Sequence, residues 1–542
     1  YSYYNGTLME QAMKEKFSQG GVLAGTSAGL AILSEVIFWA GKGSAYSDVS
    51  IKNIEDSHIT LADDFLDAAP AMIFDSHFTN RGRLGRLVAF MASYEKEKNK
   101  RIMGVGVDET TALGISKDKS GIVFGTRSVS FYKLPEEENF GQGPALSGRN
   151  INYCQLVHGD TIDLKTMEVY GLPNEVNPSV PQANSGQVVF LSGSDELASL
   201  NKAMLEKFVV SGEGKDQEII IITGASIARA TDVQSILLDL EAENVSIVKA
   251  TFDFAEDSYT QTKIENATKI LFADNSTYNF TVFLNSGTNG EILQQKLKEP
   301  GLILGFIGDN SRYAGSQIVN NYLSGGSNIS LTKGLDLLNG MCIIPKTFDS
   351  PGGATDAWYS SHLALPFAMV SEELPFGLWL NNDNYVVFAT SAGENLLTAY
   401  GNSPAMFLEM QTGRAGFTKM TYNGQNNEIP VPIAGFDNMK LSFLPDGESV
   451  NLGDPVSVKN IVNPMDEVQL FPNPVSDYLL LPNTNIPDQI TIRDLHGRVL
   501  LSVRPSVSVA GINVGFLKPG IYFLESYIEN RKTLSRFIKL DK

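Results

Sequence analysis

The chain contains an internal repeat, because residues 187–460 follow the same pattern as the segment before them. Asn289–Glu299 resembles Asn5–Glu15 in its Asn-Gly start and in the spacing of its apolar residues. The apolar run that comes next, Gly301–Asp309, corresponds to residues 20–28. Self-similarity over this length indicates two copies of one structural unit. The fold must therefore be one that this chain can form twice.

Short apolar runs alternate with amphipathic stretches in the second copy. Ala230–Glu241 has helical spacing, whereas the runs between such stretches have the length and β-branched content of buried strands. This alternation is typical of a parallel sheet covered by helices on both faces. We therefore predict an α/β protein with two tandem three-layer αβα domains. The predicted strands are Val188–Leu191, Glu218–Thr223, Val245–Thr251 and Lys269–Ala273.

A candidate nucleophile lies in the first copy, within residues 21–36. Gly25–Gly29 reads Gly-Thr-Ser-Ala-Gly and fits the nucleophile elbow, in which a strand, a sharp turn and a helix hold a serine hydroxyl exposed. Ser27 is the predicted nucleophile. The N–H of Ala28 follows it at the helix start, where it can point at an oxyanion. An ordinary Gly-rich turn between a strand and a helix would give the same pentapeptide, so this motif alone leaves both interpretations open.

A base and an acid follow the candidate serine along the chain. His77 comes directly after the apolar run that ends in Asp75 and Ser76, and the strand-like run Ile102–Val107 ends in Asp108 and Glu109. A serine nucleophile needs an imidazole to take its proton and a carboxylate to orient that imidazole. Each residue alone also fits a structural role, but their common position at strand ends favours a catalytic set.

The second copy keeps the strands of this arrangement and loses its chemistry. Gly308 stands where Ser27 stands in the first copy. Thr347–Gly353 replaces the segment that contains His77, and Leu378–Tyr385 replaces the acidic strand end. The second copy is therefore predicted to be degenerate.

The first copy resembles the cyanophycinases and the related aspartyl dipeptidases, which are serine peptidases on a class I glutamine-amidotransferase-like fold. The resemblance covers residues 5–133 and rests on three motifs: G-T-S-A-G at 25–29, D-S-H-F-T-N-R-G-R-L-G-R-L at 75–87 and G-V-G-V-D-E-T-T-A-L at 104–113. It implies Ser27 as nucleophile, His77 as base and Glu109 as orienting acid, with Asp108 as the alternative acid.

The same resemblance implies a substrate pocket. Asp75, Arg81 and Arg86 fall on substrate-binding positions of the family, and Ser76 stands where family members commonly have glutamine. We expect Arg81 and Arg86 to bind substrate carboxylates through planar guanidinium forks, and Asp75 to bind a guanidinium. A solvated helix face is the alternative interpretation of the arginines. Acyl transfer through Ser27 would need no metal and no organic cofactor.

Composition narrows the classes of partner. The formal net charge of −19 argues against nucleic acid, because no basic face is available to neutralise phosphates. No apolar run reaches the roughly 18 residues of a membrane span. Cys154 and Cys342 lie in apolar, strand-like contexts, so we predict two free, buried thiols rather than a disulfide or a metal site.

The end of the chain has a different character, with short alternating strands, turn signals and no helical pattern, as in a small β-sandwich. It resembles the C-terminal sorting domain of type IX secretion substrates from Bacteroidetes. That resemblance implies an exported, secreted or cell-surface protein that meets the type IX secretion machinery through residues 468–542. The matching segments are Phe471–Asp477, Ile492–Val499, Leu517–Phe523 and Arg536–Lys542.

These patterns predict a domain order. The expected parts are a first catalytic domain at 1–171, a linker at 172–186, the degenerate copy at 187–460, a second linker at 461–467 and the sandwich at 468–542. We expect the first domain to be N-terminally truncated and catalytically impaired, because the strands and the second oxyanion donor of the family would precede residue 1. No signal peptide is visible in the chain.

The leading functional hypothesis is a secreted serine hydrolase that cleaves cyanophycin, multi-arginyl-poly-aspartate, to β-aspartyl-arginine dipeptides. A peptidase that acts on free aspartyl peptides is an alternative. A non-catalytic secreted binding protein on the same fold is a second alternative, since the second copy has lost the candidate residues. The sequence leaves open whether the chain forms a homodimer.

Overall fold

The computed structural model divides into two compact units, residues 1–453 and 454–542, which are described separately. The predicted linker at 461–467, part of the linker at 172–186 and parts of the C-terminal unit lie outside the described residues. The residues that the structure describes are 1–179, 186–197, 199–212, 217–224, 227–273, 280, 283–320, 330–348, 356–391, 394–421, 430–452, 478–480, 489–493, 499–503, 511–518, 520–528 and 531–539.

The first repeat contains four helices and eleven strands among its described residues. Its helices are α1 (Leu8–Ser18), α2 (Ala28–Ala31), α3 (Ser47–Ser50) and α4 (Leu84–Lys98). Its strands are β1 (Ser34–Phe38), β2 (Leu61–Ala62), β3 (Ala69–Ser76), β4 (Met103–Val107), β5 (Thr111–Ile115), β6 (Ser120–Gly125), β7 (Val129–Lys133), β8 (Gly148–Leu156), β9 (Thr161–Asp163), β10 (Val169–Tyr170) and β11 (Asn174–Val176).

The second repeat adds an α/β half before a set of strands like those of the first repeat. The α/β half holds β12 (Val188–Ser192), α5 (Ser199–Val210), β13 (Glu218–Thr223), α6 (Ile227–Asp239), β14 (Asn244–Lys249), η1 (Phe252–Phe254), α7 (Ser258–Asn266), β15 (Lys269–Phe272), α9 (Gly287–Lys296) and β16 (Ile303–Phe306). The remainder holds η2 (Gly308–Ala314), β17 (Gly315–Asn320), β18 (Ser330–Lys333), β19 (Leu338–Ile344), α10 (Asp356–Ser371), β20 (Phe376–Trp379), β21 (Asn384–Ser391), β22 (Glu394–Gly401), β23 (Ala405–Met410), β24 (Gly413–Thr421), β25 (Pro430–Leu444) and β26 (Ser449–Asn451).

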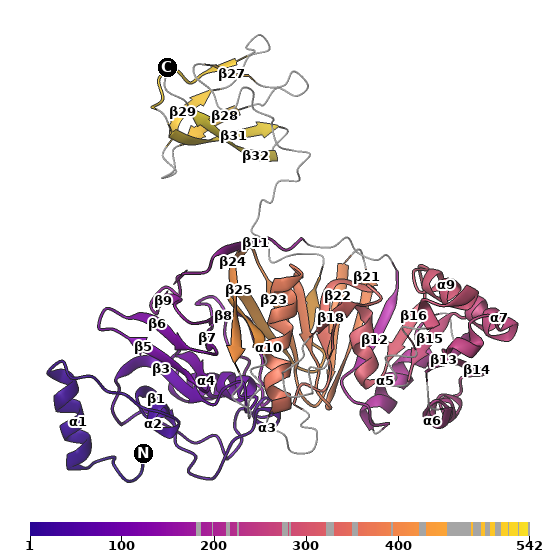
Figure 1. Cartoon of the computed structure of the whole chain (residues 1–542), viewed down its shortest axis with the longest axis horizontal. Helices are drawn as coiled ribbons and strands as arrows, with labels where there is room; N and C mark the ends of the chain where they lie inside the picture. The colour runs from indigo at the N-terminus through magenta and orange to yellow at the C-terminus, as the bar shows by residue number, and fades with distance from the viewer. Residues whose placement is uncertain are drawn as a thin grey trace. The chain divides into compact units, whose positions relative to one another are not determined.

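The two repeats share one 14-stranded sheet, whose main path runs β18-β17-β19-β20-β23-β25-β8-β7-β4-β3-β1-β2. Read inward from its two ends, the sheet has equivalent strands in the same order: β2-β1-β3-β4-β7-β8 in the first repeat and β18-β17-β19-β20-β23-β25 in the second. In each repeat two parallel pairs (β1 with β3 and β3 with β4, or β17 with β19 and β19 with β20) precede two antiparallel ones. Figure 1 shows the halves side by side, with β8 next to β25. The predicted α/β fold and its tandem repeat are thus confirmed.

The junction between the repeats has the register expected for two equivalent strands that pair with each other. Counted from the neighbouring strand pairs, Asn152 in β8 and Lys440 in β25 occupy the same place in the two repeats. These two residues lie directly opposite each other. Backbone hydrogen bonds between β8 and β25 therefore continue the sheet from one repeat into the next, and residues 1–453 form one compact unit.

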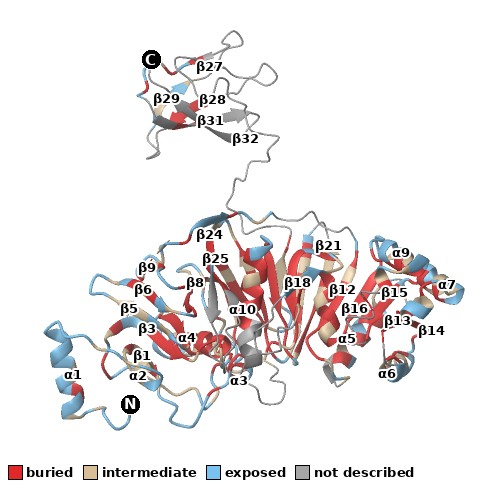
Figure 2. Ribbon diagram, viewed as in Figure 1, coloured by how far each residue is buried: buried red, intermediate tan, exposed pale blue. Residues whose placement is uncertain are grey.

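Equivalent helices pack on equivalent strands. A side chain at Gly104 of β4 would clash with Met91 and Leu87 of α4, and one at Gly377 of β20 would clash with Met369 and Leu365 of α10. Both glycines therefore permit a helix to lie close to the sheet. Buried residues are concentrated in the sheet strands and these helices, whereas α1 is mostly exposed (Figure 2). The two cysteines are free and buried, as predicted.

One local prediction was wrong. The expected strand before Ser27 is not formed, and the expected helix after it is limited to α2, because β1 begins at Ser34. In the second repeat the corresponding strand, β16, pairs with β12 and β15 on its two sides. Among its described residues the first repeat offers residues 21–26 no such neighbours, so their backbone lacks the partners that a strand needs.

The C-terminal unit is all-β in its described residues, in agreement with the predicted sandwich. One sheet pairs β27 (Tyr478–Leu480) with β30 (Gly511–Asn513). The other has the order β29 (Val499–Val503), β28 (Gln489–Arg493), β31 (Gly520–Ile528) and β32 (Arg531–Lys539). Buried apolar side chains such as Ile490, Val514 and Leu524 form its core.

A buried histidine in α10 predicts acid sensitivity. His362 is 2% exposed, packs edge-on against Phe348 and Trp379, and has no hydrogen-bond partner for its ring nitrogens within the described residues. Burial lowers its pKa from 6.5 to about 4. Because only the unfolded chain takes up this proton between those values, stability should fall as pH drops from 6.5 to 4, by at most about 3 kcal/mol. In urea unfolding at several pH values, His362→Leu should flatten this dependence. The exposed His158→Gln should leave it intact, and an unchanged slope in His362→Leu would contradict the prediction.

Candidate active site

Ser27 lies on a strained turn directly before α2. Its φ and ψ are 53° and −123°, a region that residues other than glycine rarely adopt. Gly29 N–H donates to the Thr26 carbonyl at 2.9 Å, and the N–H groups of Leu30 and Ala31 donate to that of Ser27. A Cβ atom at Gly25 would lie 2.0 Å from the Gly29 carbonyl oxygen, so only glycine permits this close approach. The turn presents Ser27 as an exposed residue.

His77 and Glu109 extend from Ser27 in a chain of hydrogen bonds. Ser27 Oγ lies 3.1 Å from His77 Nε2, and His77 Nδ1 lies 2.9 Å from Glu109 Oε1. His77 follows the C-terminal end of β3, and Glu109 lies two residues beyond the end of the adjacent parallel strand β4. The side chains of His77 and Glu109 are 28% and 22% exposed. The two strand ends thus bring together residues that are 32 positions apart.

Arg127 is a residue of the site that sequence reasoning missed. Its Nη1 donates to Glu109 Oε2 at 2.8 Å, and the residue is 6% exposed. Its position follows from the antiparallel pairing of β4 with β7, in which Val107 lies opposite Val129. Glu109, two residues after Val107, is therefore brought next to Arg127, two residues before Val129. Only the register could have revealed this pairing. Arg127 holds the carboxylate in place while the other carboxylate oxygen contacts His77.

Asp108 has a structural role that differs from the alternative considered for it. Its carboxylate accepts hydrogen bonds from the N–H and the hydroxyl of Thr79 and from those of Ser128. Burial raises its pKa above the usual range, and these hydrogen bonds oppose the rise. Asp108 ties the loop after His77 to the start of β7. Of the two acidic candidates, the one in contact with His77 is Glu109.

The structure places Asp75 and Arg86 differently from the predicted substrate pocket. Asp75 Oδ2 accepts from Arg86 Nε at 2.7 Å, and Oδ1 accepts from Arg86 Nη2 at 2.7 Å and from Arg83 Nη1 at 3.0 Å. Burial would raise the pKa of Asp75, but Arg86 and Arg83 hold it below the usual range. Burial lowers the pKa of Arg83 to about 10. The forked contacts expected to reach a substrate are thus made inside the protein.

Arg81 and Ser76 complete the predicted set. Arg81 is exposed, and its backbone N–H donates to the His77 carbonyl at 3.2 Å. Ser76 is buried, and its carbonyl accepts from Arg83 Nη1 at 2.6 Å. Of the three predicted pocket residues with charged side chains, the one that remains at the surface is therefore Arg81. A substrate carboxylate can reach its guanidinium without first breaking a buried ion pair.

The arrangement has the parts needed for acyl transfer. An imidazole in contact with a serine hydroxyl can take its proton, and a carboxylate on the other ring nitrogen can orient the ring. The N–H of Ala28 follows Ser27 at the start of α2. In the described part of the chain, no three His, Cys, Asp or Glu side chains gather in a way that could hold a metal ion.

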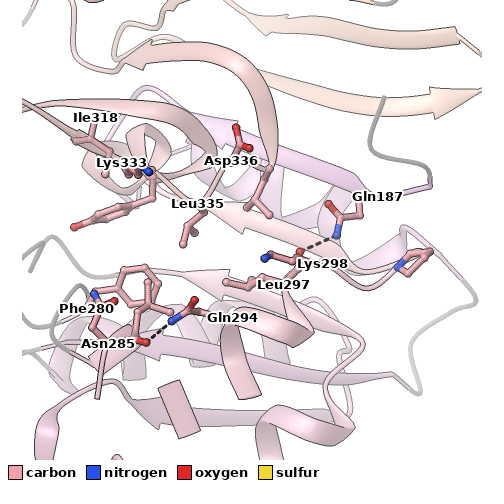
Figure 3. Close-up of a pocket in the computed structure, with 15 residues that line it drawn as sticks. Gln187, Phe280, Asn285, Gln294, Leu297, Lys298, Ile318, Lys333, Leu335 and Asp336 are labelled. Atoms are coloured by element: carbon pink, nitrogen blue, oxygen red, sulfur yellow. Dashed lines mark hydrogen bonds between the residues drawn. The ribbon is translucent and has the colours of Figure 1, made fainter. Parts of the chain in front are cut away.

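A cavity of ≈ 660 Å³ lies in the second repeat and does not include the candidate site. It lies between α9 and the paired strands β17 and β18, with Phe280, Leu297 and Leu335 on its apolar walls (Figure 3). Gln187 and Gln294, which also line it, donate to the backbone carbonyls of Leu297 and Leu284. Their polar groups thus hold the wall in place.

None of the helices within the described ranges is both long and apolar enough to cross a membrane.

Comparison with known proteins shows that part of the chain is similar to proteins of one enzyme family. The chain is 32% identical over 147 residues to a cyanophycinase from Trichormus variabilis, covering 26% of this chain and 45% of that protein. It is 27% identical over 168 residues to a cyanophycinase from Synechococcus elongatus, covering 30% and 48%. The chain thus spans about half the length of the curated relatives that it matches.

Two further comparisons concern the C-terminal residues and the solved structures. Residues 469–540 match the family model of the secretion system C-terminal sorting domain. The crystal structure of a peptidase from an acI-B1 Actinobacterium aligns with 51% of this chain and 97% of its own, at 12% identity and a TM-score of 0.34.

Proposed function

We propose that this chain, part of which is similar to cyanophycinases, is a secreted serine peptidase that cleaves cyanophycin to β-aspartyl-arginine dipeptides. The observation that carries this proposal is the hydrogen-bonded chain from Ser27 through His77 to Glu109. The strained backbone at Ser27 supports it, because such strain is typical of functional positions. A peptidase for smaller aspartyl peptides is the alternative with the same residues.

In this proposal the hydroxyl of Ser27 attacks the scissile carbonyl while His77 takes its proton. Glu109 fixes the ring so that Nε2 faces the serine, and it stabilises the imidazolium that forms. The N–H of Ala28 donates to the carbonyl oxygen as negative charge develops there. His77 then gives the proton to the leaving amine, and water releases the acyl group from Ser27 by the reverse sequence of proton transfers.

The substrate proposal rests on Arg81. In cyanophycin the aspartate side chains are joined to arginine, whose own carboxylate is free, and the exposed guanidinium of Arg81, four residues beyond His77, can bind that carboxylate through a planar fork. Asp75 and Arg86 are then positioning residues, which shape the loop between β3 and α4. The side-chain arginines of the polymer would have to find other acidic partners than Asp75, whose oxygens are already occupied.

The C-terminal unit supports the proposal that the protein is exported. The match of residues 469–540 to a sorting domain fits delivery by the type IX secretion machinery to the cell surface or the medium. Cleavage of an extracellular polymer would suit such a location.

Active-site labelling tests the serine chemistry separately from the substrate. The full chain should react with a fluorophosphonate probe at Ser27, as located by peptide mass spectrometry, and should release β-aspartyl-arginine from insoluble cyanophycin. Labelling without release would favour the aspartyl peptidase alternative. A folded chain that neither labels nor hydrolyses would contradict the proposal and favour a binding protein.

Arg81→Lys should weaken substrate use by more than its conserved charge suggests. A lysine ammonium cannot make the two parallel hydrogen bonds that a guanidinium makes to a carboxylate. We expect kcat/KM for cyanophycin to fall by about tenfold, which corresponds to about 1.4 kcal/mol, mainly through KM. Arg149→Lys, the same change at a residue that contacts Glu448 in the second repeat, is the matched control. Equal kinetics for both variants would return Arg81 to the role of a solvated surface residue.

A further inference from the structure

The second repeat has a lysine at the position of the candidate base. His77 lies directly after β3 and Lys346 lies two residues beyond β19, and both have a positive φ, 48° and 55°. The register makes them equivalent, because Ile73 lies opposite Gly104 and Cys342 lies opposite Gly377. The next residue confirms the alignment. Phe78 N–H donates to the Val107 carbonyl across the sheet, and Thr347 N–H donates to the Leu380 carbonyl. From the sequence alone, Thr347–Gly353 was predicted to replace the segment that contains His77, and that range begins one residue after Lys346.

The other candidate positions also have counterparts. Gly308 has a φ of 57°, close to the 53° of Ser27, as its sequence position predicts. The N–H of Asp309 therefore corresponds to that of Ala28. A Cβ at Gly125 would lie 2.2 Å from the Thr110 carbonyl oxygen, and one at Gly401 would lie 2.2 Å from that of Asp383, so these two pairs are also equivalent.

The acid of the candidate triad is also replaced. If Asp383 stands where Thr110 stands, then Asn382 stands where Glu109 stands. Hydroxyl, imidazole and carboxylate are thus replaced by a glycine, a lysine and an asparagine. The second repeat has no means of forming an acyl-enzyme at this place.

A carboxylate from another part of the second repeat fills the vacated space. Asp195, three residues beyond β12, places Oδ1 3.0 Å from the N–H of Asp309, which donates to it. A Cβ at Gly308 would lie 1.9 Å from the same oxygen, so any side chain there would displace it. The other oxygen, Oδ2, forms an ion pair with Lys346 Nζ, which lies 3.8 Å from Asp309 Oδ1.

We propose that the second repeat contains a carboxylate-binding site made by the Asp309 N–H and the Lys346 ammonium. In this structure the site is occupied by the side-chain carboxylate of Asp195. One carboxylate oxygen accepts from the backbone where the first repeat would bind an oxyanion. The other oxygen pairs with a cation where the first repeat has its base. The side chains of Lys346 and Asp195 are 14% and 19% exposed, so the pair is largely shielded from water and still reachable by a small anion.

The site takes a carboxylate rather than a larger anion. Asp195 fits with one oxygen on each binding group, which is the geometry of a planar, two-oxygen ligand. The same chemistry suits the aspartate carboxylates of an acidic polymer, but the inference is independent of whether the first repeat hydrolyses one.

Removal of the internal carboxylate should open the site. Asp195→Ala should lower the thermal unfolding midpoint of the full chain, because Lys346 and the Asp309 N–H lose a partner. Sodium acetate should restore the midpoint in a saturable manner, since a ligand that binds only the folded state stabilises it by mass action. Sodium chloride at the same ionic strength should not. The double variant Asp195→Ala/Lys346→Met should not respond to acetate.

Two controls separate this site from general effects. Asp257→Ala removes a carboxylate that caps α7 through the Thr260 N–H, so it should lower the midpoint without rescue by acetate. Asp195→Asn fills the space without the charge, so it should be less stable than the unaltered chain and insensitive to acetate. Equal rescue of Asp257→Ala, or an Asp195→Asn variant as stable as the unaltered chain, would overturn the proposal.

Discussion

Ser27→Ala should reduce cyanophycin turnover by at least about 10³-fold while leaving the fold intact. Without the hydroxyl, only substrate binding and the oxyanion donor remain, and such groups alone give little catalysis. Stability should hardly change, because Ser27 is exposed and alanine keeps the same strained turn. The measurement is release of β-aspartyl-arginine, with thermal unfolding followed in parallel.

The comparison of single and double variants makes this test specific. His77→Ala should cost about as much as Ser27→Ala, and the double variant should cost little more, because residues that act as a unit are strongly non-additive. The exposed Ser57→Ala in the same repeat is the control and should behave as the unaltered chain. Wild-type turnover in Ser27→Ala would rule out the serine mechanism.

The parts of the site that could be predicted from sequence are those set by local geometry. The turn at Ser27 depends on a glycine two residues away, and His77 and Glu109 lie just beyond strands that are recognisable by their apolar character. Parallel neighbouring strands end at the same edge, so their end residues meet. The repeat was visible for the same reason, because strand and turn patterns persist after the chemistry has changed.

The parts that escaped prediction depend on which distant side chains meet. Arg127 reaches Glu109 only through the register of β4 and β7. The sequence positions of Asp75 and Arg86 are compatible both with substrate binding and with an ion pair between the two side chains. In the structure both are buried and contact each other, which favours the ion pair. The continuous sheet through β8 and β25 also needs the pairing of two strands almost 300 residues apart in sequence.

Asp75→Asn should destabilise the first unit strongly. The change leaves Arg86 and Arg83 with no counter-charge at the point where both contact Asp75, and Arg86 is 6% exposed. Breaking a buried ion pair by removal of one partner typically costs about 3–5 kcal/mol. The pKa of Asp75 is held below its usual range, so its stabilising charge is complete above the usual value and is lost as pH falls through the lowered one. Urea unfolding at neutral pH should show the loss, and the exposed Asp48→Asn should not.

The same variant separates a positioning role from a substrate contact. If Asp75 only positions the loop after His77, the fraction of Asp75→Asn that stays folded should bind cyanophycin with little change in KM, and its loss of activity should follow its loss of folded protein. If Asp75 instead binds a substrate guanidinium, KM should rise while the free energy of unfolding stays near that of the unaltered chain. Because Arg86 already spans both oxygens of Asp75, a substrate guanidinium could bind there only by displacing it, so we expect the first outcome.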